Sequence, residues 1–381
     1  MQRPSLRSFI LYFLRLGTLG FGGPIALAGH MQQDLVERRG WITAQEYKEG
    51  LALAQLAPGP LAAQLAMYLG WVQARALGAT LVGLAFVGPS FVMVLILSAL
   101  YVRFGGLPWM QGLFYGIGAA VIALIARSVL KLVRMTLGRD RLLWSLFVAS
   151  ALVTAWTESE VIWVFFLCGL VPVIVRGRLK ASSVVAPGLL PAAPWLGSSL
   201  GGTVSNGLLW KILGYFAGAG LFVFGSGLAI VPFLYGGVVQ QFHWLTERQF
   251  IDAVAVSMIT PGPVVITVGF IGYLVAGLPG AALAAVGVFL PVYVVVVLVA
   301  PHFSRVAKNL RVKAFVDGVT AAATGAIAGA AVILGRRSLM DIPTILIGLA
   351  TLAFLLVPKK IPEPVLILAA GLVGLLLKGA V

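Results

Sequence analysis

The residues of this sequence best suited to bind a small anion are Pro58, Gly59 and Pro60, which interrupt an apolar run. That run extends from Gly50 to Trp71 and is long enough to cross a bilayer. The two prolines remove amide donors and clash with the preceding turn, so a helix must stop before them and restart after them. A restarting helix presents unpaired N–H groups and a partial positive charge. Inside a membrane, such a helix end is suited to replace the hydration shell of an oxyanion.

Three further breaks of this kind occur in the chain. Residues 260–263 read Thr-Pro-Gly-Pro inside the apolar run 250–273, and glycine-rich breaks occur at 20–24 and 224–227. Paired breaks at matching places in two halves indicate a transporter's substrate site near the membrane midplane. The alternative is that the glycines permit close helix packing and the prolines only kink their helices. The substrate-binding residues predicted from the four breaks are Gly22, Gly23, Pro24, Pro58, Gly59, Pro60, Gly225, Ser226, Gly227, Thr260, Pro261, Gly262 and Pro263.

Polar side chains beside the breaks extend this predicted site. Gln55 and Gln64 flank the first Pro-Gly-Pro at helical spacing, so their amides could donate to an oxyanion. Thr260 and Thr267 are their analogues by position in the second half. Arg15 lies in the middle of an apolar span, where an arginine either binds the anion or snorkels to the membrane surface. Each of these polar groups could instead bond neighbouring helices together.

A carrier driven by a proton gradient also needs a group that titrates. His30 is a candidate because histidine is the side-chain type whose ordinary pKa lies nearest to neutral pH, and Glu49 and Asp252 occupy matching positions in the two halves. The alternative for each candidate is a solvated charge in a loop or at a helix end, since ionisable groups avoid hydrocarbon. The proton-coupling candidates are His30, Glu46, Glu49, Asp252 and Asp317.

Neither a catalytic site nor a metal site is indicated. A membrane enzyme acting on lipids needs acids or histidines gathered at one membrane face, but the 12 acidic residues and 3 histidines are scattered. The sequence contains no His-Glu-x-x-His, Cys-x-x-Cys or phosphate-binding P-loop motif. We therefore expect a protein that is not an enzyme, holds no metal and uses no cofactor.

The elements that must position these residues are membrane helices. Of the 381 residues, 60% are hydrophobic and only 10% are charged, whereas soluble domains are nearer a quarter charged. Long apolar blocks without strand-like alternation indicate an all-α polytopic membrane protein. We assign the net charge of +15 to cytoplasmic loops that meet anionic lipid, and not to nucleic-acid binding.

The sequence consists of two similar halves. A shift of 203 residues aligns Phe21-Gly22 with Phe224-Gly225 and one Pro-Gly-Pro with the other, and the shift becomes 202 from Gly70 onward. The N-terminal apolar segment has a copy in mid-chain, so we do not interpret it as a signal peptide. We expect an N-terminal repeat at 1–180, a linker at 181–203 and a C-terminal repeat at 204–381.

Each half contains six apolar spans, and the last two are short for full crossings. The heaviest basic loop follows the fourth span in the first half but the third span in the second half. Because basic loops stay in the cytoplasm, this difference favours an inverted-topology repeat with about 10–12 membrane segments and broken helices. The predicted spans are 9–29, 50–72, 77–102, 110–133, 142–157 and 161–175, then 208–235, 250–273, 277–300, 314–334, 343–357 and 364–378.

These motifs resemble those of the chromate ion transporters, in the long form with two halves. Gly227 stands where the first half has Pro24, which leaves open whether both halves bind substrate equally. The residues that carry the resemblance are Phe21-Gly22-Gly23-Pro24, His30, Arg38-Arg39-Gly40-Trp41-Ile42, Ala57-Pro58-Gly59-Pro60, Gln64, Gly70 and Gly88-Pro89-Ser90-Phe91, with weaker echoes at Gly225-Ser226-Gly227 and Thr260-Pro261-Gly262-Pro263.

The resemblance implies a secondary active transporter that exports chromate, a tetrahedral dianion, under the proton gradient and so gives chromate resistance. It also implies a multi-pass protein of the cytoplasmic (inner) membrane. Two alternatives remain, a transporter of sulfate or another oxyanion and a passive anion channel. The expected partners are the lipid bilayer and chromate, with sulfate and a homodimer as open alternatives and with no nucleic acid.

Overall fold

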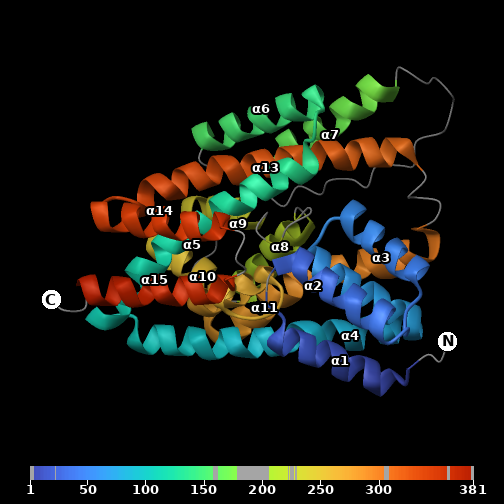
Figure 1. The fold of residues 1–381 in the computed structure, drawn as a ribbon, viewed down its shortest axis with the longest axis horizontal. Helices are drawn as coiled ribbons and strands as arrows, with labels where there is room; N and C mark the ends of the chain where they lie inside the picture. Colours follow the sequence, from blue (N-terminus) through green and yellow to red (C-terminus); the bar gives the residue numbers. More distant parts are fainter. Residues whose placement is uncertain are drawn as a thin grey trace.

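The part of the chain that the structure describes is folded into helices, with no strand among its residues (Figure 1). This computed structural model describes residues 4–21, 23–157, 162–177, 206–221, 223, 227, 230–303, 309–357 and 361–378. The expected linker at 181–203 lies outside the described residues. The all-α fold class predicted from the long apolar blocks is confirmed.

The two halves contain equivalent elements in the same order. In the first half these are α1 (Leu6–Leu19), α2 (Gly23–Met31), the π-helix η1 (Gln32–Arg38), α3 (Ala44–Leu56), α4 (Leu61–Phe104), α5 (Pro108–Thr136), α6 (Arg141–Thr157) and α7 (Ile162–Gly177). In the second half they are α8 (Asn206–Leu221), α9 (Ile230–Leu234), the π-helix η3 (Tyr235–Gln241), α10 (Glu247–Ile259), the 3₁₀ turn η4 (Val264–Ile266), α11 (Thr267–Val299), the 3₁₀ turn η5 (Ala300–His302), α13 (Leu310–Ser338), α14 (Ile342–Leu356) and α15 (Glu363–Lys378).

A hairpin formed by α3 and the start of α4 carries the first Pro-Gly-Pro at its tip. A capping box begins α3, with the Glu46 amide 3.0 Å from Thr43 Oγ1 and the Thr43 amide 2.9 Å from Glu46 Oε2. Beyond the tip the chain returns, and the Tyr68 hydroxyl donates to Glu49 Oε2 at 3.4 Å. These two residues would lie about 28 Å apart along a continuous helix. The predicted span 50–72 is therefore two helices side by side and not one interrupted crossing.

The second half repeats this hairpin with α10 and α11. Thr246 and Gln249 form its capping box, with the Gln249 amide 3.2 Å from Thr246 Oγ1. The helix ends at Ile259, Pro261-Gly262-Pro263 forms the tip, and η4 precedes the restarted helix. The capping sequences and the prolines thus define both hairpins locally, because each stops or starts a helix by itself.

A second reversal follows each hairpin. Ala74 (φ −150°, ψ 36°) and Arg75 (φ 52°) leave the helical region inside α4, and residues 276–277 do the same inside α11. The chain turns back so tightly that a Cβ on Gly70 would overlap the carbonyl group of Gly78. Glycine at both positions lets the two arms of α4 touch through their backbones. Only the second, longer arm of each helix is available to span a membrane.

The halves exchange their last two helices. In Figure 1, α6 and α7 lie along α13 of the second half, and α14 and α15 pack on α5 of the first half. A Cβ on Gly318 would overlap the carbonyl oxygen of Cys168, and one on Gly116 would overlap that of Ala370. These two contacts are equivalent under the shift of 202 residues. Reciprocal contacts of this kind are the signature of a twofold relation between the halves.

The equivalent arms of α4 and α11 run in opposite directions. The hydroxyl of Thr80 donates to the Tyr293 hydroxyl at 3.0 Å. The counterpart of Thr80 is Ala282, eleven residues before Tyr293. Parallel helices related by a twofold axis would place Thr80 beside Ala282, so the observed contact requires an antiparallel pair. This geometry is that of an inverted repeat.

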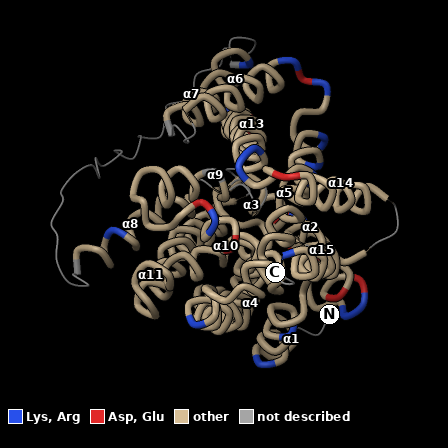
Figure 2. Tube along the Cα trace, turned by 90° about the vertical axis from the view of Figure 1, so that its left-hand side faces the viewer, with Lys and Arg blue, Asp and Glu red and all other residues tan. Residues whose placement is uncertain are grey.

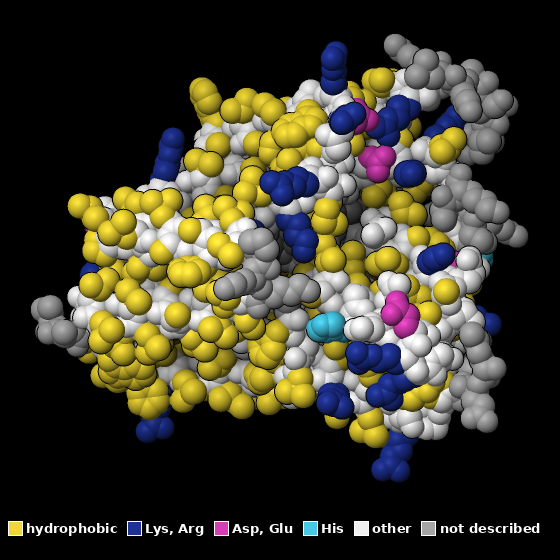
Figure 3. All heavy atoms as spheres, in the orientation of Figure 1, with side chains coloured by type: hydrophobic (Ala, Val, Ile, Leu, Met, Phe, Trp, Pro, Cys, Tyr) yellow, Lys and Arg dark blue, Asp and Glu magenta, His cyan; other side chains and the backbone are white. Residues whose placement is uncertain are grey.

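The exterior of the molecule is suited to lipid. Exposed leucines such as Leu84 and Leu376 cover the outer faces of the helices, and the region around α14, α15 and α4 is almost wholly apolar (Figure 3). Lysine and arginine lie mostly at helix ends and in connections (Figure 2). The protein is therefore a multi-pass membrane protein. Among the described residues, the helical segments long and apolar enough to cross a bilayer are Leu61–Phe104, Pro108–Thr136, Val264–His302 and Leu310–Ser338.

A charged cluster joins the exchanged helices α6 and α7 to α13. Arg176 near the end of α7 pairs with Asp317 of α13, Nη1 to Oδ2 3.1 Å, and also with Asp140 at the start of α6. Partial burial acts in the opposite direction, but the amides of Leu142 and Leu143 and the Arg176 guanidinium together lower the pKa of Asp140. The cluster thus contributes most where Asp140 is ionised.

The equivalent cluster in the other half is less charged. Asp341 caps α14 and accepts a hydrogen bond from the Tyr115 hydroxyl of α5 at 2.6 Å. The ammonium of Lys378, at the end of α15, lies 4.1 Å from the centre of the Tyr115 ring. Hydrogen bonds from the hydroxyls of Thr344 and Tyr115 lower the pKa of Asp341. Tyr115 therefore replaces the carboxylate that Asp317 supplies in the first cluster.

Candidate functional site

The four breaks form two reciprocal pairs inside the protein. The amide of Gly59 donates to the carbonyl of Val223 at an N···O distance of 2.6 Å, and the amide of Gly262 donates to the carbonyl of Gly20 at 2.9 Å. Each Pro-Gly-Pro tip therefore bonds to the first break of the other half. Both contacts are related by the shift of 203 residues, so they follow the same twofold relation as the two halves.

Glycine is required at both tips. Gly59 has φ +136° and Gly262 has φ +96°, which L-residues with a Cβ rarely adopt. A Cβ at Gly59 would lie 2.6 Å from Gln64 Nε2 and 2.9 Å from a methyl group of Val292. A Cβ at Gly262 would overlap the hydroxyl of Ser90 on α4. The tips are therefore places of close backbone approach as well as of unusual torsion.

The helix that restarts after the first tip begins inside the protein. Pro60 is extended, with φ −66° and ψ 111°, and α4 starts at the next residue. The first-turn residues Leu61, Ala62 and Ala63 are all buried. The partial positive charge of this helix end is thus held away from bulk water, where it acts most strongly on an anion. In the second half η4 intervenes, so α11 starts one turn later.

Gln64 completes the first tip. Its Nε2 donates to the carbonyl oxygens of Pro58 at 2.5 Å and Ala57 at 3.4 Å, which the break removes from helical bonding. The side chain is fully buried, and among the described residues its Oε1 has no hydrogen-bond partner. Buried acceptors are normally paired with protein, water or ligand. The tip therefore contains an acceptor for which the described residues supply no donor.

The other residues predicted from the breaks lie near the tips where the structure describes them. Gly23 begins α2 with φ +74° and has open space at its Cβ position, and Pro24 follows it in the first turn. Gly227 is buried beside Val264 and Val265, just after the second tip. Gly22, Gly225 and Ser226 lie outside the described residues. Pro58, Pro60, Pro261 and Pro263 all belong to the two tips.

Four predicted polar residues are not brought to the tips as free donors. The hydroxyls of Thr260 and Thr267 bond to carbonyls three residues earlier in their own turns, at 3.1 and 2.7 Å. Arg15 lies on the exposed side of α1, and Gln55 is exposed on α3. For Arg15 this position favours the snorkelling alternative.

Asp252 is the proton-coupling candidate that the structure buries. It is 4% exposed on α10, and the Tyr101 hydroxyl of α4 donates to its Oδ2 at 2.7 Å. Its counterpart Glu49 is half-buried and stays within its own hairpin, where Gln45 Nε2 donates to its Oε1 at 2.8 Å and the Tyr68 hydroxyl bonds its Oε2. Matching positions in the repeat thus have different surroundings.

The remaining candidates lie in local structures. Glu46 is part of the capping box of α3, and Asp317 is paired with Arg176. His30 is exposed at the end of α2. These positions match the alternative given for them above, a charge in a loop or at a helix end.

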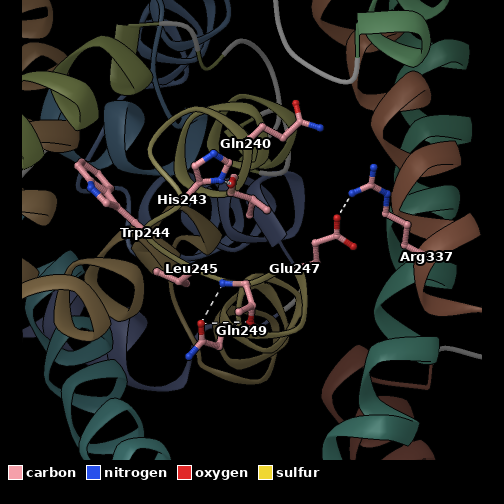
Figure 4. Close-up of a pocket in the computed structure, with 9 residues that line it drawn as sticks. Gln240, His243, Trp244, Leu245, Glu247, Gln249 and Arg337 are labelled. Carbon is pink, nitrogen blue, oxygen red and sulfur yellow. Dashed lines mark hydrogen bonds and ion pairs between the residues drawn. The ribbon is translucent and has the colours of Figure 1, made fainter.

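Two cavities adjoin the start of α10. The larger has a volume of about 640 Å³. It is lined by Arg337 of α13 and by eight residues between Val239 and Gln249. Figure 4 shows Arg337 and Glu247 facing one another, and they form an ion pair. The Tyr235 hydroxyl donates to Glu247 Oε1 at 3.1 Å. This cavity therefore has a closed network of charged and polar groups on one side.

The smaller cavity reaches the buried carboxyl group. Its volume is about 170 Å³, and Asp252, Tyr101 and Arg248 are among its lining residues. Thr246 and Gln249 line both cavities, so the two are neighbours across the capping box of α10. A polar cavity of this size has room for several water molecules.

Comparison with known proteins decides the family. The family model described as Chromate transporter matches residues 7–173 and again residues 210–375. The chain belongs to the chromate transporter family. The double match follows the two halves seen in the sequence and in the fold. No solved structure matches the chain.

The similar members of the family are transport proteins by name. The chain is 59% identical over 376 residues to the "Chromate transport protein" of Cupriavidus metallidurans, covering 97% of this chain and 93% of that one. It is 53% identical over 383 residues to the "Probable chromate transport protein" of Synechococcus elongatus, covering 98% and 95%. A "Chromate transport protein" of Pseudomonas aeruginosa is 33% identical, covering 95% and 90%.

Sequence reasoning missed the groups that α4 presents to the second hairpin of this chromate transporter family member. Tyr101 belongs to none of the motifs identified in the sequence, and Ser90 is part of one of them without a predicted role. Both differ in polarity from their counterparts, which are Phe303 and Val292. A comparison of the aligned halves for such polarity differences could have found them.

Proposed function

We propose that this chain is a secondary active transporter that exports chromate across the inner (cytoplasmic) membrane, is coupled to protons and confers chromate resistance. Relatives at 59% and 53% identity over nearly the whole chain are named as a chromate transport protein and a probable one. Chromate is a compact tetrahedral dianion, and a transporter must replace its hydration shell within the membrane. Main-chain amides and helix ends meet that need without a buried cation.

The proposed substrate site is formed by the two tips and the breaks they contact. The reciprocal bonds from Gly59 to Val223 and from Gly262 to Gly20 carry this proposal. Each bond joins a Pro-Gly-Pro tip to the chain beside the first break of the other half, and helices that are only kinked would not need such a pairing. The buried first turn of α4 after Pro60 supplies a helix N-terminus with its partial positive charge.

Gln64 is part of the proposed site. Its Nε2 neutralises carbonyl groups at the end of α3, so these do not oppose the positive end of α4. Its unpartnered Oε1 can accept a hydrogen bond from a water that accompanies the anion. Arg15 and Gln55 are exposed, and the proposal does not depend on them.

Sulfate is the alternative substrate with a physical reason. It has the shape and charge of chromate, and main-chain amides respond to charge, size and geometry and not to the central atom. A passive anion channel would use the same helix ends but no titrating group. The three possibilities differ in what drives net flux.

The test is flux of labelled chromate and labelled sulfate into proteoliposomes with an imposed pH gradient. We expect chromate to accumulate against its own gradient and an uncoupler to abolish that accumulation. Accumulation of sulfate alone would reassign the substrate. Chromate flux that only equilibrates, and that an uncoupler does not change, would identify a channel.

The site itself is tested by Gly59→Leu and Pro60→Ala. We expect each to reduce chromate flux by at least about tenfold, since small displacements of positioned groups have large effects. Gly29→Leu is the matched control, because Gly29 is exposed on α2 and has open space at its Cβ position. Wild-type flux in both tip variants, at normal expression and membrane insertion, would show that the break is only architectural.

A further inference from the structure

A single carboxyl group is enclosed by the two halves. Among the described residues, Asp252 is the only Asp, Glu, Lys, Arg or His side chain that is buried. Its hydrogen-bond donor among the described residues, Tyr101, comes from the other half of the repeat. A buried carboxylate without a close cationic partner is costly unless it can take up a proton. The group is therefore placed where its charge state matters to the contact between the halves.

We infer that Asp252, tied to Tyr101 across the two halves, is the group that binds and releases the coupling proton, and that the first hairpin carries no such step. This inference rests on the proposed function, since it names the coupling residue of that transporter. It also implies that the two halves of the repeat have separate tasks.

The surroundings of Asp252 contain few other charges. Arg248, on the same helix, is the nearest cation, and its Nη2 donates to the Gln111 carbonyl of α5 at 3.3 Å. From α5 the cavity lining consists of Met110, Gln111 and Phe114, none of which titrates. From α4 it contains Tyr101 and Gly105. Of the lining residues described, α11 and α15 supply none.

Water can reach the carboxyl group through the smaller cavity. Asp252, Arg248 and Tyr101 line it together, and its volume of about 170 Å³ holds several waters. A proton therefore moves between cavity water and Asp252 without crossing packed side chains. The ionised carboxylate gains one proton and becomes neutral, and the reverse step returns that proton to water.

Two helices connect this carboxyl group to the second tip. Asp252 lies about 12 Å along α10 from Thr260. Tyr101 lies three turns beyond Ser90 on the same face of α4. Ser90 in turn contacts Gly262 at the tip and donates to the carbonyl of Gly17 at 3.3 Å. The Asp252–Tyr101 bond and the tip contact are thus two links between the same pair of elements.

The first hairpin lacks each of these features. Tyr101 corresponds to Phe303 and Ser90 corresponds to Val292, so neither counterpart has a hydroxyl. Glu49 is bonded by Gln45 and the Tyr68 hydroxyl within its own hairpin. Protonation of Glu49 would therefore change bonds inside one hairpin and not a bond between halves.

The bond to Tyr101 gives the coupling a direction. The ionised carboxylate accepts a stronger hydrogen bond from the Tyr101 hydroxyl than the neutral acid does, so the ionised state ties α10 more firmly to α4. Protonation loosens the tie and with it the second tip. Proton and anion then exclude one another, which is what export driven by entering protons requires.

The experiment is calorimetric titration of the purified full chain with chromate between pH 6 and pH 8, in buffers of different ionisation enthalpy. We expect the wild type to bind chromate about five- to tenfold more weakly at pH 6 and to release protons on binding. Asp252→Asn should bind with an affinity that does not change with pH and should release no protons. Glu49→Gln is the matched control and should behave as the wild type.

A second variant guards against a misfolded Asp252→Asn. Tyr101→Phe keeps the ring that packs on Phe114 and Phe270 and removes only the hydroxyl. It should lose the pH dependence of affinity, whereas Phe303→Tyr, at the equivalent position in the second half, should not alter it. Wild-type proton release and pH dependence in both Asp252→Asn and Tyr101→Phe would overturn the inference. A wild type that binds no chromate would overturn the proposed function instead. Tighter binding at pH 6 that vanishes in Asp252→Asn would keep Asp252 as the coupling group and overturn proton-driven export.

Discussion

The hairpin α3–α4 and the hairpin α10–α11 begin with the same capping box and end in the same Pro-Gly-Pro. Both are followed by a second reversal, at 74–75 and at 276–277. Both tips donate an amide to the opposite half, from Gly59 and from Gly262. The capping boxes, the Pro-Gly-Pro segments and the helix reversals are therefore present in both halves.

The side chains that face these hairpins differ. Gly59 lies against Val292, whereas Gly262 lies against the hydroxyl of Ser90. The base of the second hairpin is charged and bonded to other elements, through Asp252 with Tyr101 and Glu247 with Arg337. The equivalent carboxyl group of the first hairpin, Glu49, is bonded within its own hairpin by Gln45 and Tyr68.

The difference between the hairpins fits a duplicated transporter in which both halves bind the anion and one hairpin binds the coupling proton. A binding site built from backbone amides needs torsions and helix ends, which duplication copies directly. A coupling site needs one buried titrating group, and a second copy would double the cost of burying a carboxylate. One hairpin can therefore retain the titrating group and its polar partner, while the equivalent of that partner is apolar for the other hairpin.

The largest expected effect comes from alanine at the two tip glycines. Gly262→Ala should reduce chromate flux by about tenfold or more, and Gly59→Ala by a smaller factor. At Gly262 the new Cβ overlaps the Ser90 hydroxyl on a helix, whereas at Gly59 the nearest atom is the flexible end of Gln64. Flux of reconstituted protein measures both. Ser90→Gly should partly restore Gly262→Ala, and equal losses without rescue would show that the tip contacts are not the cause.

An intermediate effect is expected on stability from the polar residue that follows each tip. Gln64→Leu leaves the buried carbonyls of Pro58 and Ala57 without their donor and should destabilise the fold by about 1–3 kcal/mol. Thr267→Val removes one bond within a single turn and should cost about 1 kcal/mol or less. Thermal unfolding in detergent gives the difference. Gln55→Leu, an exposed control, should not shift the transition; a shift as large as that of Gln64→Leu would contradict this account.

The smallest effect is expected at the two terminal clusters. The pKa of Asp140 is lowered in the fold, so its ionised form stabilises the protein above the ordinary Asp value of about 4. That contribution is lost as the pH falls through the lowered folded-state pKa. Asp140→Asn should lower the melting temperature at pH 7 by about 2 °C and have no effect at a pH where Asp140 is protonated.

Asp341→Asn is the matched variant in the other cluster. It should have the smaller effect, because Asp341 bonds the neutral hydroxyls of Tyr115 and Thr344, whereas Asp140 pairs with Arg176. Melting curves of both variants at neutral and low pH check the order. A larger shift for Asp341→Asn would show that the ion pair with Arg176 does not distinguish the clusters.

Much of the fold could be read from the sequence. The lengths of the apolar blocks predicted the helices. The repeated Pro-Gly-Pro predicted the two halves and the places where helices stop. The charge distribution of the basic loops predicted an inverted repeat, and the antiparallel contact of Thr80 with Tyr293 agrees with it. These features are local or periodic, so each can be recognised from a short stretch of residues.

The position of the candidate site depended partly on contacts between residues that are far apart in the chain. The amide of each tip bonds to the other half of the chain, Gly59 to Val223 and Gly262 to Gly20. That the four breaks form one substrate site stays a prediction. The side-by-side packing of α3 with the start of α4 was not foreseen, because an interrupted span and a hairpin have the same sequence pattern.

By itself, the sequence determined where each helix breaks, since proline and glycine act on the torsions of their own residues. Only the tertiary structure decided which carboxyl group is buried, because Glu49 and Asp252 occupy equivalent positions and differ in what other elements place beside them. Burial and hydrogen bonding across 151 residues, from Tyr101 to Asp252, are properties of packing, and no local pattern encodes them.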